Sequence, residues 1–300
     1  MTPSVDEPTY YDRPALKEPV WIWSVPAYFY AGGLAGAAMT LGLAAQIAGG
    51  SRLRRFAERC RWIGALGGGL GSILLIADLG RPERFLYMLR VFRPTSPMSI
   101  GSWVLATATP LSAGSALLTR ASGFRRILGN WFGIQAGILG LPLATYTGVL
   151  LSNTAVPVWQ QARRELPLLF GASAAASLAS LLELLPSNAS ERHVAARLGL
   201  VSRGSELVAA RLVERAVTRV PGVGQALITG AAGALWTTSA ILTAASLVLS
   251  LAPVSFRGKR SLTGAMGTLA GLALRFAVFQ AGRASARDPR ATFRSQRAGL

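Results

Sequence analysis

Few side chains in this sequence could do chemistry inside an apolar environment. Asp78, Tyr146, Glu183, Glu206 and Arg275 lie within or at the edges of long apolar segments. Ionisable groups in such places act as proton relays or form ion pairs, because an isolated charge in hydrocarbon is costly. These residue types therefore predict proton transfer or ion pairing, with Arg275 expected to have a buried carboxylate partner.

Metal chemistry has little support in the composition. Cys60 is the one cysteine and His193 the one histidine. A self-contained iron–sulfur cluster needs about four thiolates, and a haem with two histidine ligands needs a second histidine. The sequence predicts no metal site, no haem and no iron–sulfur cluster in this chain, and no residue acting as a catalyst on its own.

The elements that must position these residues are membrane spans. Hydrophobic residues make up 51% of the 300-residue chain and charged residues 15%, well below the quarter typical of soluble domains. The run from Trp131 to Leu151 contains no ionisable side chain except Tyr146, and it is long enough to cross a bilayer. We therefore predict an all-α, polytopic transmembrane helix bundle.

The net charge of +18 does not indicate nucleic-acid binding. Apart from Arg275, the basic residues fall outside the apolar segments. Basic residues in loops between spans reflect topology and anionic lipid headgroups rather than a nucleic-acid surface. The lipid bilayer is the predicted partner of this charge.

Seven segments are strong span candidates, and an eighth is ambiguous. The polar segment 194–213 is either a helix lying on the membrane surface or a polar span buried among its neighbours. The distribution of Lys and Arg favours seven spans, with the N-terminus outside. The strong candidates are 27–49, 62–79, 99–119, 131–151, 166–186, 224–252 and 262–282.

The fourth candidate span carries a phenol near its outer end, at Tyr146. A phenol there can donate a hydrogen bond to a quinone carbonyl. Alternatively, it satisfies a backbone group freed by Pro142. The sequence leaves both interpretations open.

Two outer segments are rich in residues that could bind a ligand or a partner. The arm before the first span ends in Trp21 and Trp23, which form either an interfacial aromatic belt or the wall of a site for a lipid-soluble ring. Asp78, in the last turn of the second span, and Arg81, in the loop 80–98, are spaced for an ion pair. Arg84, Arg90 and Arg93 in that loop either snorkel to the interface or dock a partner.

Several of these motifs resemble one family of membrane subunits. The stretches are Tyr11-Asp12-Arg13-Pro14, Asp78-Leu79-Gly80-Arg81-Pro82-Glu83-Arg84-Phe85, Pro94-Thr95-Ser96-Pro97-Met98-Ser99, Thr145-Tyr146-Thr147-Gly148 and Arg275-Phe276-Ala277-Val278-Phe279. Together they resemble the polysulfide-reductase-type, or NrfD/PsrC-like, integral membrane subunits. The resemblance is dense over about 10–160 and thin over 187–260.

The resemblance implies about eight helices in two four-helix bundles, so we expect 194–213 to be a polar span. The expected organisation is an extracytoplasmic arm, a first bundle on the quinone side, a second bundle and a basic tail. Their ranges are 1–26, 27–151, 152–282 and 283–300. The implied location is the inner (cell) membrane of a bacterium.

The resemblance also implies a function in electron transport, including anaerobic respiration. Such subunits exchange electrons between menaquinone or ubiquinone and an iron–sulfur partner with several [4Fe-4S] clusters, often alongside a molybdopterin catalytic subunit. By position, Tyr146 is the implied hydrogen-bond donor to the ring. The implied pocket wall is formed by residues near it and in the arm: Thr147, Tyr11, Lys17 and Trp21.

The sequence departs from the family pattern in ways that keep other functions open. The arm lacks the histidine and asparagine that some relatives place at the quinone, and Gln160 stands where others have a histidine. One alternative is a structural anchor without a working quinone site. The other is a secondary transporter or proton channel, although the inverted repeats typical of transporters are not evident.

Overall fold

The computed structural model describes residues 16–50, 52–220, 222–254 and 256–297. All regular structure in these residues is helical. Eight helices are long: α1 (Ser24–Ala48), α2 (Arg54–Asp78), α4 (Pro97–Leu118), α5 (Gly123–Ser152), α7 (Glu165–Leu184), α8 (Ala189–Thr218), α10 (Gly230–Leu251) and α11 (Lys259–Arg287). Four short helices complete the described chain: α3 (Glu83–Met88), α6 (Pro157–Gln161), α9 (Gln225–Ile228) and α12 (Pro289–Arg297).

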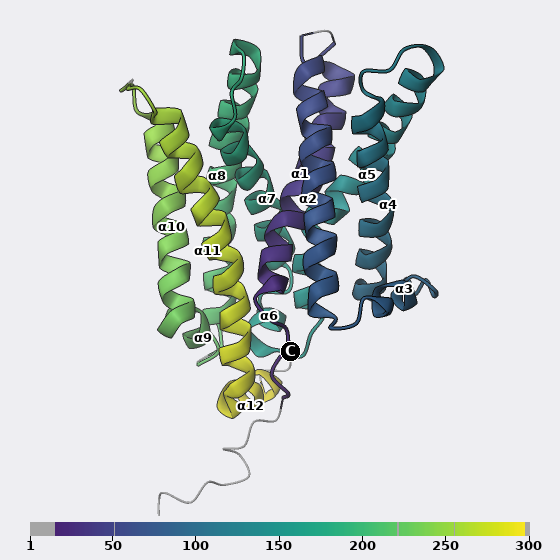
Figure 1. Cartoon of the computed structure of the whole chain (residues 1–300). Helices are drawn as coiled ribbons and strands as arrows, with labels where there is room; N and C mark the ends of the chain where they lie inside the picture. The colour runs from purple at the N-terminus through teal and green to yellow at the C-terminus, as the bar shows by residue number, and fades with distance from the viewer. Residues whose placement is uncertain (1–15, 51, 221, 255, 298–300) are drawn as a thin grey trace, which may run out of the picture.

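The long helices form two groups of four. In the first, α1 packs against α2 and α5, and α4 packs against α2 and α5. In the second, α7 packs against α8 and α11, and α10 packs against the same two helices (Figure 1). Contacts of α1 and α5 with α7, and of α1 with α11, join the groups. The predicted polytopic helical bundle is confirmed.

Six of the long helices are apolar and long enough to cross a membrane; α4 and α8 do not reach that hydropathy. The predicted polar segment 194–213 is the middle of α8, a 30-residue helix. Its buried residues form one stripe that includes Ala195, Ser202 and Glu206. Glu206 and the other buried polar groups of α8 face neighbouring helices rather than lipid, which makes burial of a polar helix in the bundle less costly.

The arm and the end of α11 lie on the same face of the molecule. The Glu18 carboxylate accepts hydrogen bonds from Arg287 Nε at 2.7 Å and from the Arg283 side chain. We call the face that contains residues 16–23, α3, α6, α9 and α12 the N-terminal face (Figure 1). These contacts place Glu18 and Arg283 on one face, which fits an even number of crossings rather than the seven that the charge count favours.

Several helix ends differ from the predicted spans, for local reasons. Gly80, with φ of +67°, ends the turn after α2 in the left-handed region that glycine adopts without strain. Pro97 stands at the start of α4, where its missing N–H costs nothing. The predicted 224–252 span is divided, since α9 ends at Ile228 and α10 begins at Gly230. At the other end, α11 continues past residue 283 into the predicted tail.

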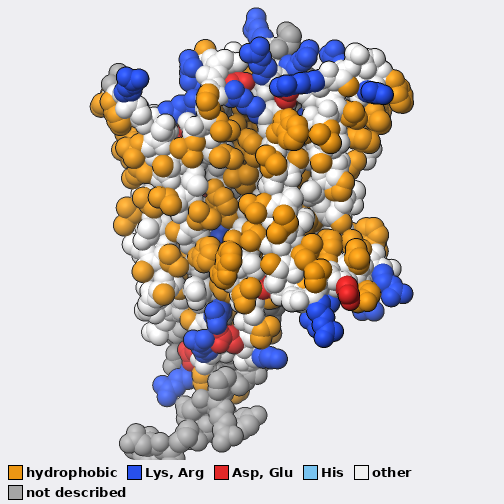
Figure 2. Space-filling view, viewed as in Figure 1, with side chains coloured by type: hydrophobic (Ala, Val, Ile, Leu, Met, Phe, Trp, Pro, Cys, Tyr) orange, Lys and Arg blue, Asp and Glu red, His pale blue; other side chains and the backbone are white. Residues whose placement is uncertain are grey.

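The surface of the bundle has the pattern of a membrane protein. Figure 2 shows apolar side chains over the middle of the visible face, with Lys and Arg side chains gathered towards both ends. Exposed apolar side chains on several helices include Leu66, Ile138, Val201 and Ile241. This distribution matches a hydrocarbon layer flanked by headgroups.

Candidate functional site

A small cavity lies inside the first bundle, near the N-terminal face. It encloses about 90 Å³ and is bounded by α1, α2, α4 and α5, with contributions from the arm and α3. Its lining is mostly apolar or aromatic, with a few polar groups. The lining residues are Trp21, Val25, Tyr28, Phe29, Leu75, Asp78, Leu79, Met88, Met98, Ser102, Tyr146 and Leu150.

Two phenols meet at this cavity. The Tyr28 hydroxyl on α1 donates a hydrogen bond to the Tyr146 hydroxyl on α5 at 2.8 Å. Tyr28 is 1% exposed and Tyr146 8%. The partner of the Tyr146 hydroxyl is therefore another phenol, and not a backbone group freed by Pro142.

Glycines on neighbouring helices make room for these rings. A Cβ at Gly101 on α4 would lie 1.9 Å from Tyr146 Cε2, closer than any contact allows. Cβ atoms at Gly32 and Gly71 would lie 3.2 and 3.3 Å from the Tyr28 ring. The Tyr146 ring therefore rests directly on the backbone of α4 at Gly101.

The arm forms one wall of the cavity. Asp78 Oδ1 accepts a hydrogen bond from the backbone N–H of Ile22 at 3.0 Å. The Trp21 ring stacks on Trp159 of α6, with centroids 6.1 Å apart and planes 20° apart. Arg81 is exposed, and within the described chain it forms no ion pair with Asp78. Asp78 therefore holds the arm against the end of α2 through its hydrogen bond with Ile22.

Two other residues that the resemblance placed at the quinone, Lys17 and Thr147, do not line this cavity. Lys17 is exposed on the arm. Thr147 is buried beside Tyr146 in the chain, but its hydroxyl has no hydrogen-bond partner in the described structure. Tyr11 lies outside the described residues.

The loop between α2 and α4 presents a mixed surface at the N-terminal face. Arg84, Arg90 and Arg93 are all exposed. Large apolar side chains are exposed between them: Leu86, Tyr87, Val91 and Phe92. Figure 1 shows α3 projecting sideways from the bundle at this level. The loop therefore offers both charge and apolar area to a neighbouring molecule.

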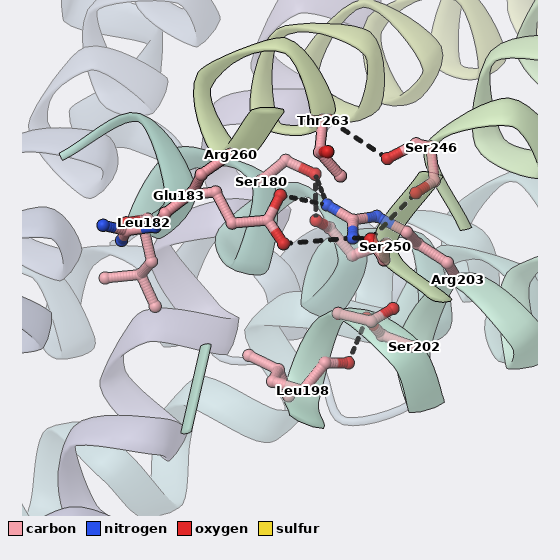
Figure 3. Close-up of polar contacts among 12 residues, drawn as sticks. Ser180, Leu182, Glu183, Leu198, Ser202, Arg203, Ser246, Ser250, Arg260 and Thr263 are labelled. Carbon is pink, nitrogen blue, oxygen red and sulfur yellow. Dashed lines mark hydrogen bonds and ion pairs between the residues drawn. The ribbon is translucent and has the colours of Figure 1, made fainter. Parts of the chain in front are cut away.

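A second polar site lies inside the second bundle, where Arg203 and Glu183 form a buried ion pair. Arg203 Nη2 lies 2.6 Å from Glu183 Oε2, and Arg203 Nη1 lies 3.1 Å from Glu183 Oε1. Arg203 also donates to Ser180 Oγ at 3.1 Å and Ser250 Oγ at 3.0 Å (Figure 3). The guanidinium links α7, α8 and α10.

Arg275 and Glu206 lie deeper in the same bundle, and both are fully buried. Arg275 Nη2 donates to the Phe170 carbonyl at 3.0 Å, and its guanidinium carbon lies 3.9 Å from the centroid of the Phe170 ring. No ion pair within the described residues joins Arg275 to a carboxylate, although Glu206 acts on it electrostatically. Arg275 Nε and Nη1 and Glu206 Oε1 have no hydrogen-bond partner.

Sequence reasoning missed several residues of these two sites. The expectations drawn from the sequence assign neither Tyr28 nor Arg203 to a site. The detectable signal for Arg203 was its position three residues before Glu206, which places both on one face of a helix. Gly101 carried no signal, because a glycine's role depends on the ring that packs against it.

No group of three or more His, Cys, Asp or Glu side chains in the described chain is arranged to hold a metal ion. The cavity of the first bundle offers instead phenols, a carboxylate and apolar walls. Such a lining suits a planar, lipid-soluble ring with polar oxygens better than it suits a cation.

Comparison with known proteins identifies the family of the chain. No curated protein matches it significantly. The family model described as "Polysulphide reductase, NrfD" matches residues 13–285, which is most of the chain. Members of this family are membrane subunits of quinone-linked oxidoreductases. The chain therefore belongs to the NrfD polysulphide reductase family.

Proposed function

We propose that this chain is the quinone-reactive membrane subunit of an oxidoreductase complex. It exchanges electrons between menaquinone or ubiquinone and an iron–sulfur partner subunit. The observation that carries the proposal is the cavity of the first bundle, where the hydroxyls of Tyr28 and Tyr146 meet 2.8 Å apart among apolar walls. A quinone headgroup needs hydroxyl groups to hydrogen-bond its carbonyl oxygens and apolar walls to pack against its ring.

The phenol pair provides a directed hydrogen bond. Because Tyr28 donates to the Tyr146 oxygen, the Tyr146 proton is free to be donated to a ring carbonyl oxygen. Burial strengthens such a hydrogen bond, since water does not compete for it. Asp78, which also lines the cavity, is the carboxylate placed to exchange a proton with the ring.

Electrons must pass between the ring and a partner protein. The loop that carries α3 is the proposed docking surface, because Arg84, Arg90 and Arg93 are exposed on the face where the cavity lies. Charged residues steer a partner, while the apolar side chains between them supply buried area. We propose an iron–sulfur protein with several [4Fe-4S] clusters as this partner, with a molybdopterin catalytic subunit beyond it.

The second bundle is the proposed route for protons. The Glu183–Arg203 pair and, one helical turn further along α8, Glu206 with the nearby Arg275 of α11 place ionisable groups inside this bundle. Buried polar atoms without protein partners, such as Glu206 Oε1, are normally satisfied by internal water. Internal water between ionisable side chains supports proton transfer. The same groups would serve a proton channel, the runner-up function.

We place the chain in the inner membrane of a bacterium, with the N-terminal face outside. In this orientation the quinone cavity and the partner lie on the outer side. The alternative of a structural anchor without quinone predicts an empty cavity in the purified complex.

Labelling with a photoreactive quinone tests the proposal. The complex, purified from its native membrane, is illuminated with an azidoquinone, and labelled peptides are identified by mass spectrometry. We expect labels within 21–29, 75–79, 98–102 or 146–150, with excess natural quinone suppressing them. Labels confined to lipid-facing positions such as Val201, or labels insensitive to natural quinone, would favour the anchor or channel.

A further inference from the structure

A separate groove runs between the two bundles, at the depth of the membrane. It has a volume of about 260 Å³ and is bounded by α1, α5, α7 and α8 (Figure 1). It shares no lining residue with the cavity that holds the two phenols. The groove is lined by Ala37, Thr40, Leu41, Ala44, Leu141, Ala144, Thr145, Gly171, Ala175, Leu178 and Leu198.

The groove presents only carbon to an occupant. Its two hydroxyl groups are satisfied by the helices that carry them or by their neighbours. Thr40 Oγ1 donates to the carbonyl of Gly36 at 3.0 Å and also faces that of Gly137 at 3.2 Å. Thr145 Oγ1 donates to the carbonyl of Leu141 at 3.2 Å. A ligand that needs hydrogen bonds would find none here.

Small residues line much of the groove on three helices. Ala37 and Ala44 lie two turns apart on one face of α1, about 10 Å along the helix axis. Ala144, Ala175 and Gly171 line the facing helices. If the groove were empty, the side chains that line it would lose dispersion contacts along its whole length. Ala44 and Leu141 are exposed, so the groove opens to the outside of the protein.

The two helices that flank the opening begin with basic side chains on the face opposite the N-terminal face. Arg125 and Arg126 are exposed in the first turn of α5, and Arg192 and Arg197 are exposed near the start of α8. Arg197 directly precedes Leu198, which lines the groove. A molecule with its chain in the groove would have its headgroup towards Arg192 and Arg197 of α8, the helix that lines the groove at Leu198.

We propose that this groove is a binding site for one acyl chain of an anionic phospholipid. The lipid's phosphate lies beside Arg192 and Arg197, near the start of α8. The lipid site shares no lining residue with the quinone cavity. The proposal therefore does not depend on whether that cavity binds quinone. The bound lipid fills the interface between the bundles and contributes to holding them together.

The test is native mass spectrometry of the intact complex after detergent delipidation. We expect wild type to retain a stoichiometric phospholipid that resists washing. The variants Ala44→Leu and Ala175→Leu fill the groove and should reduce the retained lipid to background. The matched control, Ala234→Leu, adds the same volume at an exposed position on α10 that does not line the groove. It should leave the lipid in place.

The headgroup is tested by replacing Arg192 and Arg197 with glutamine. We expect the preference for anionic over zwitterionic lipid to fall by about fivefold for each arginine removed. Equal retention of lipid in the groove variants and in wild type would overturn the proposal. So would retention of a quinone tail or detergent alone, which would assign the groove to another occupant or to none.

Discussion

At the level of single residues, the close contact between Tyr146 and Gly101 determines where the Tyr146 ring lies in the cavity. The phenol can reach Tyr28 only because α4 has no side chain where the ring lies. A methyl group there must displace either the ring or the helix. The position of the ring is thus determined by a residue that cannot itself bind a ligand.

Gly101→Ala should therefore abolish quinone chemistry while leaving the complex assembled. We expect quinol-dependent reduction of the partner to fall about 100-fold, because small misplacements of a reacting group carry costs of that order. The rate is measured in the purified complex. Gly69→Ala is the control, since a Cβ at Gly69 meets nothing within 4 Å. Unchanged activity in Gly101→Ala would mean that the Tyr146 ring position is irrelevant to function.

The Glu183–Arg203 pair makes a prediction about stability. Glu183→Gln leaves the buried Arg203 charge uncompensated, so we expect the free energy of unfolding to fall by about 3–5 kcal/mol. The measurement is unfolding of the purified chain in mixed detergent micelles. Arg120→Gln is the control: Arg120 is 88% exposed in its pair with Glu58, and we expect a loss below about 1 kcal/mol. Similar losses of unfolding free energy in the two variants would show that the buried Glu183–Arg203 pair contributes no more to stability than the exposed Arg120–Glu58 pair.

Some site residues could be predicted from the sequence and others could not, for a physical reason. Trp21, Asp78 and Tyr146 were singled out because such side chains are unusual near a membrane span, and all three line one cavity. The hydrogen bond from Tyr28 depends on how α1 and α5 pack, and single-sequence patterns carry no such distances. The roles of these residues in quinone binding stay predictions.

At the level of elements, the arm from Leu16 to Trp23 is held by groups from three parts of the chain. Asp78 of α2 accepts from Ile22, Trp159 of α6 stacks on Trp21, and Glu18 binds the end of α11. Because Arg287 donates to it, the pKa of the Glu18 carboxyl lies below its ordinary value. The ion pair is therefore complete at neutral pH.

A carboxyl with a lowered pKa stabilises the docked arm above its ordinary pKa and ceases to do so as pH falls below that range. We expect a spin label at Val20, which is 77% exposed, to become more mobile in electron paramagnetic resonance spectra below about pH 4.5. Glu18→Gln should give the mobile spectrum already at pH 7. The label is attached at Val20→Cys in a chain that carries Cys60→Ser, so that no native cysteine is labelled. Glu83→Gln is the control. A spectrum in Glu18→Gln that matches wild type at pH 7 would show that the ion pair does not hold the arm.

Long apolar helices were predictable, whereas their ends and the short helices were less so. The run from Trp131 to Leu151 identified α5 because length and apolarity are properties of the sequence itself. The start of α2 at Arg54 was not predicted, since its first turns are rich in arginine and carry no apolar signal. The short helix α3 follows from a local turn and has no periodic pattern long enough to detect.

At the level of the whole molecule, eight long helices return the chain to the face where it began. The count of basic residues is a weak guide to the number of spans because Lys and Arg lie on both faces (Figure 2). The rule is a statistical bias on loops, and α8 carries much of the charge within a helix. The contact of Glu18 with α11 is the more direct indicator.

Reporter fusions test this topology. We expect reporters at the two ends of the chain to give the outside signal, because an even number of crossings separates Glu18 from Arg287. A reporter inserted in the turn 119–122, between α4 and α5, should give the inside signal. Opposite signals from the two ends would show that one of the eight helices does not cross, with α8 the first to examine.

The quinone cavity in the first bundle is the central claim, and the rate of quinol-dependent cluster reduction in the purified complex tests it most directly. Tyr146→Phe removes the hydroxyl while keeping the ring that packs on Gly101. The account predicts a loss of tenfold or more in this variant, with the partner subunits still bound and quinone still recovered from wild type. A wild-type rate in Tyr146→Phe, together with a complex that contains no quinone, would contradict it.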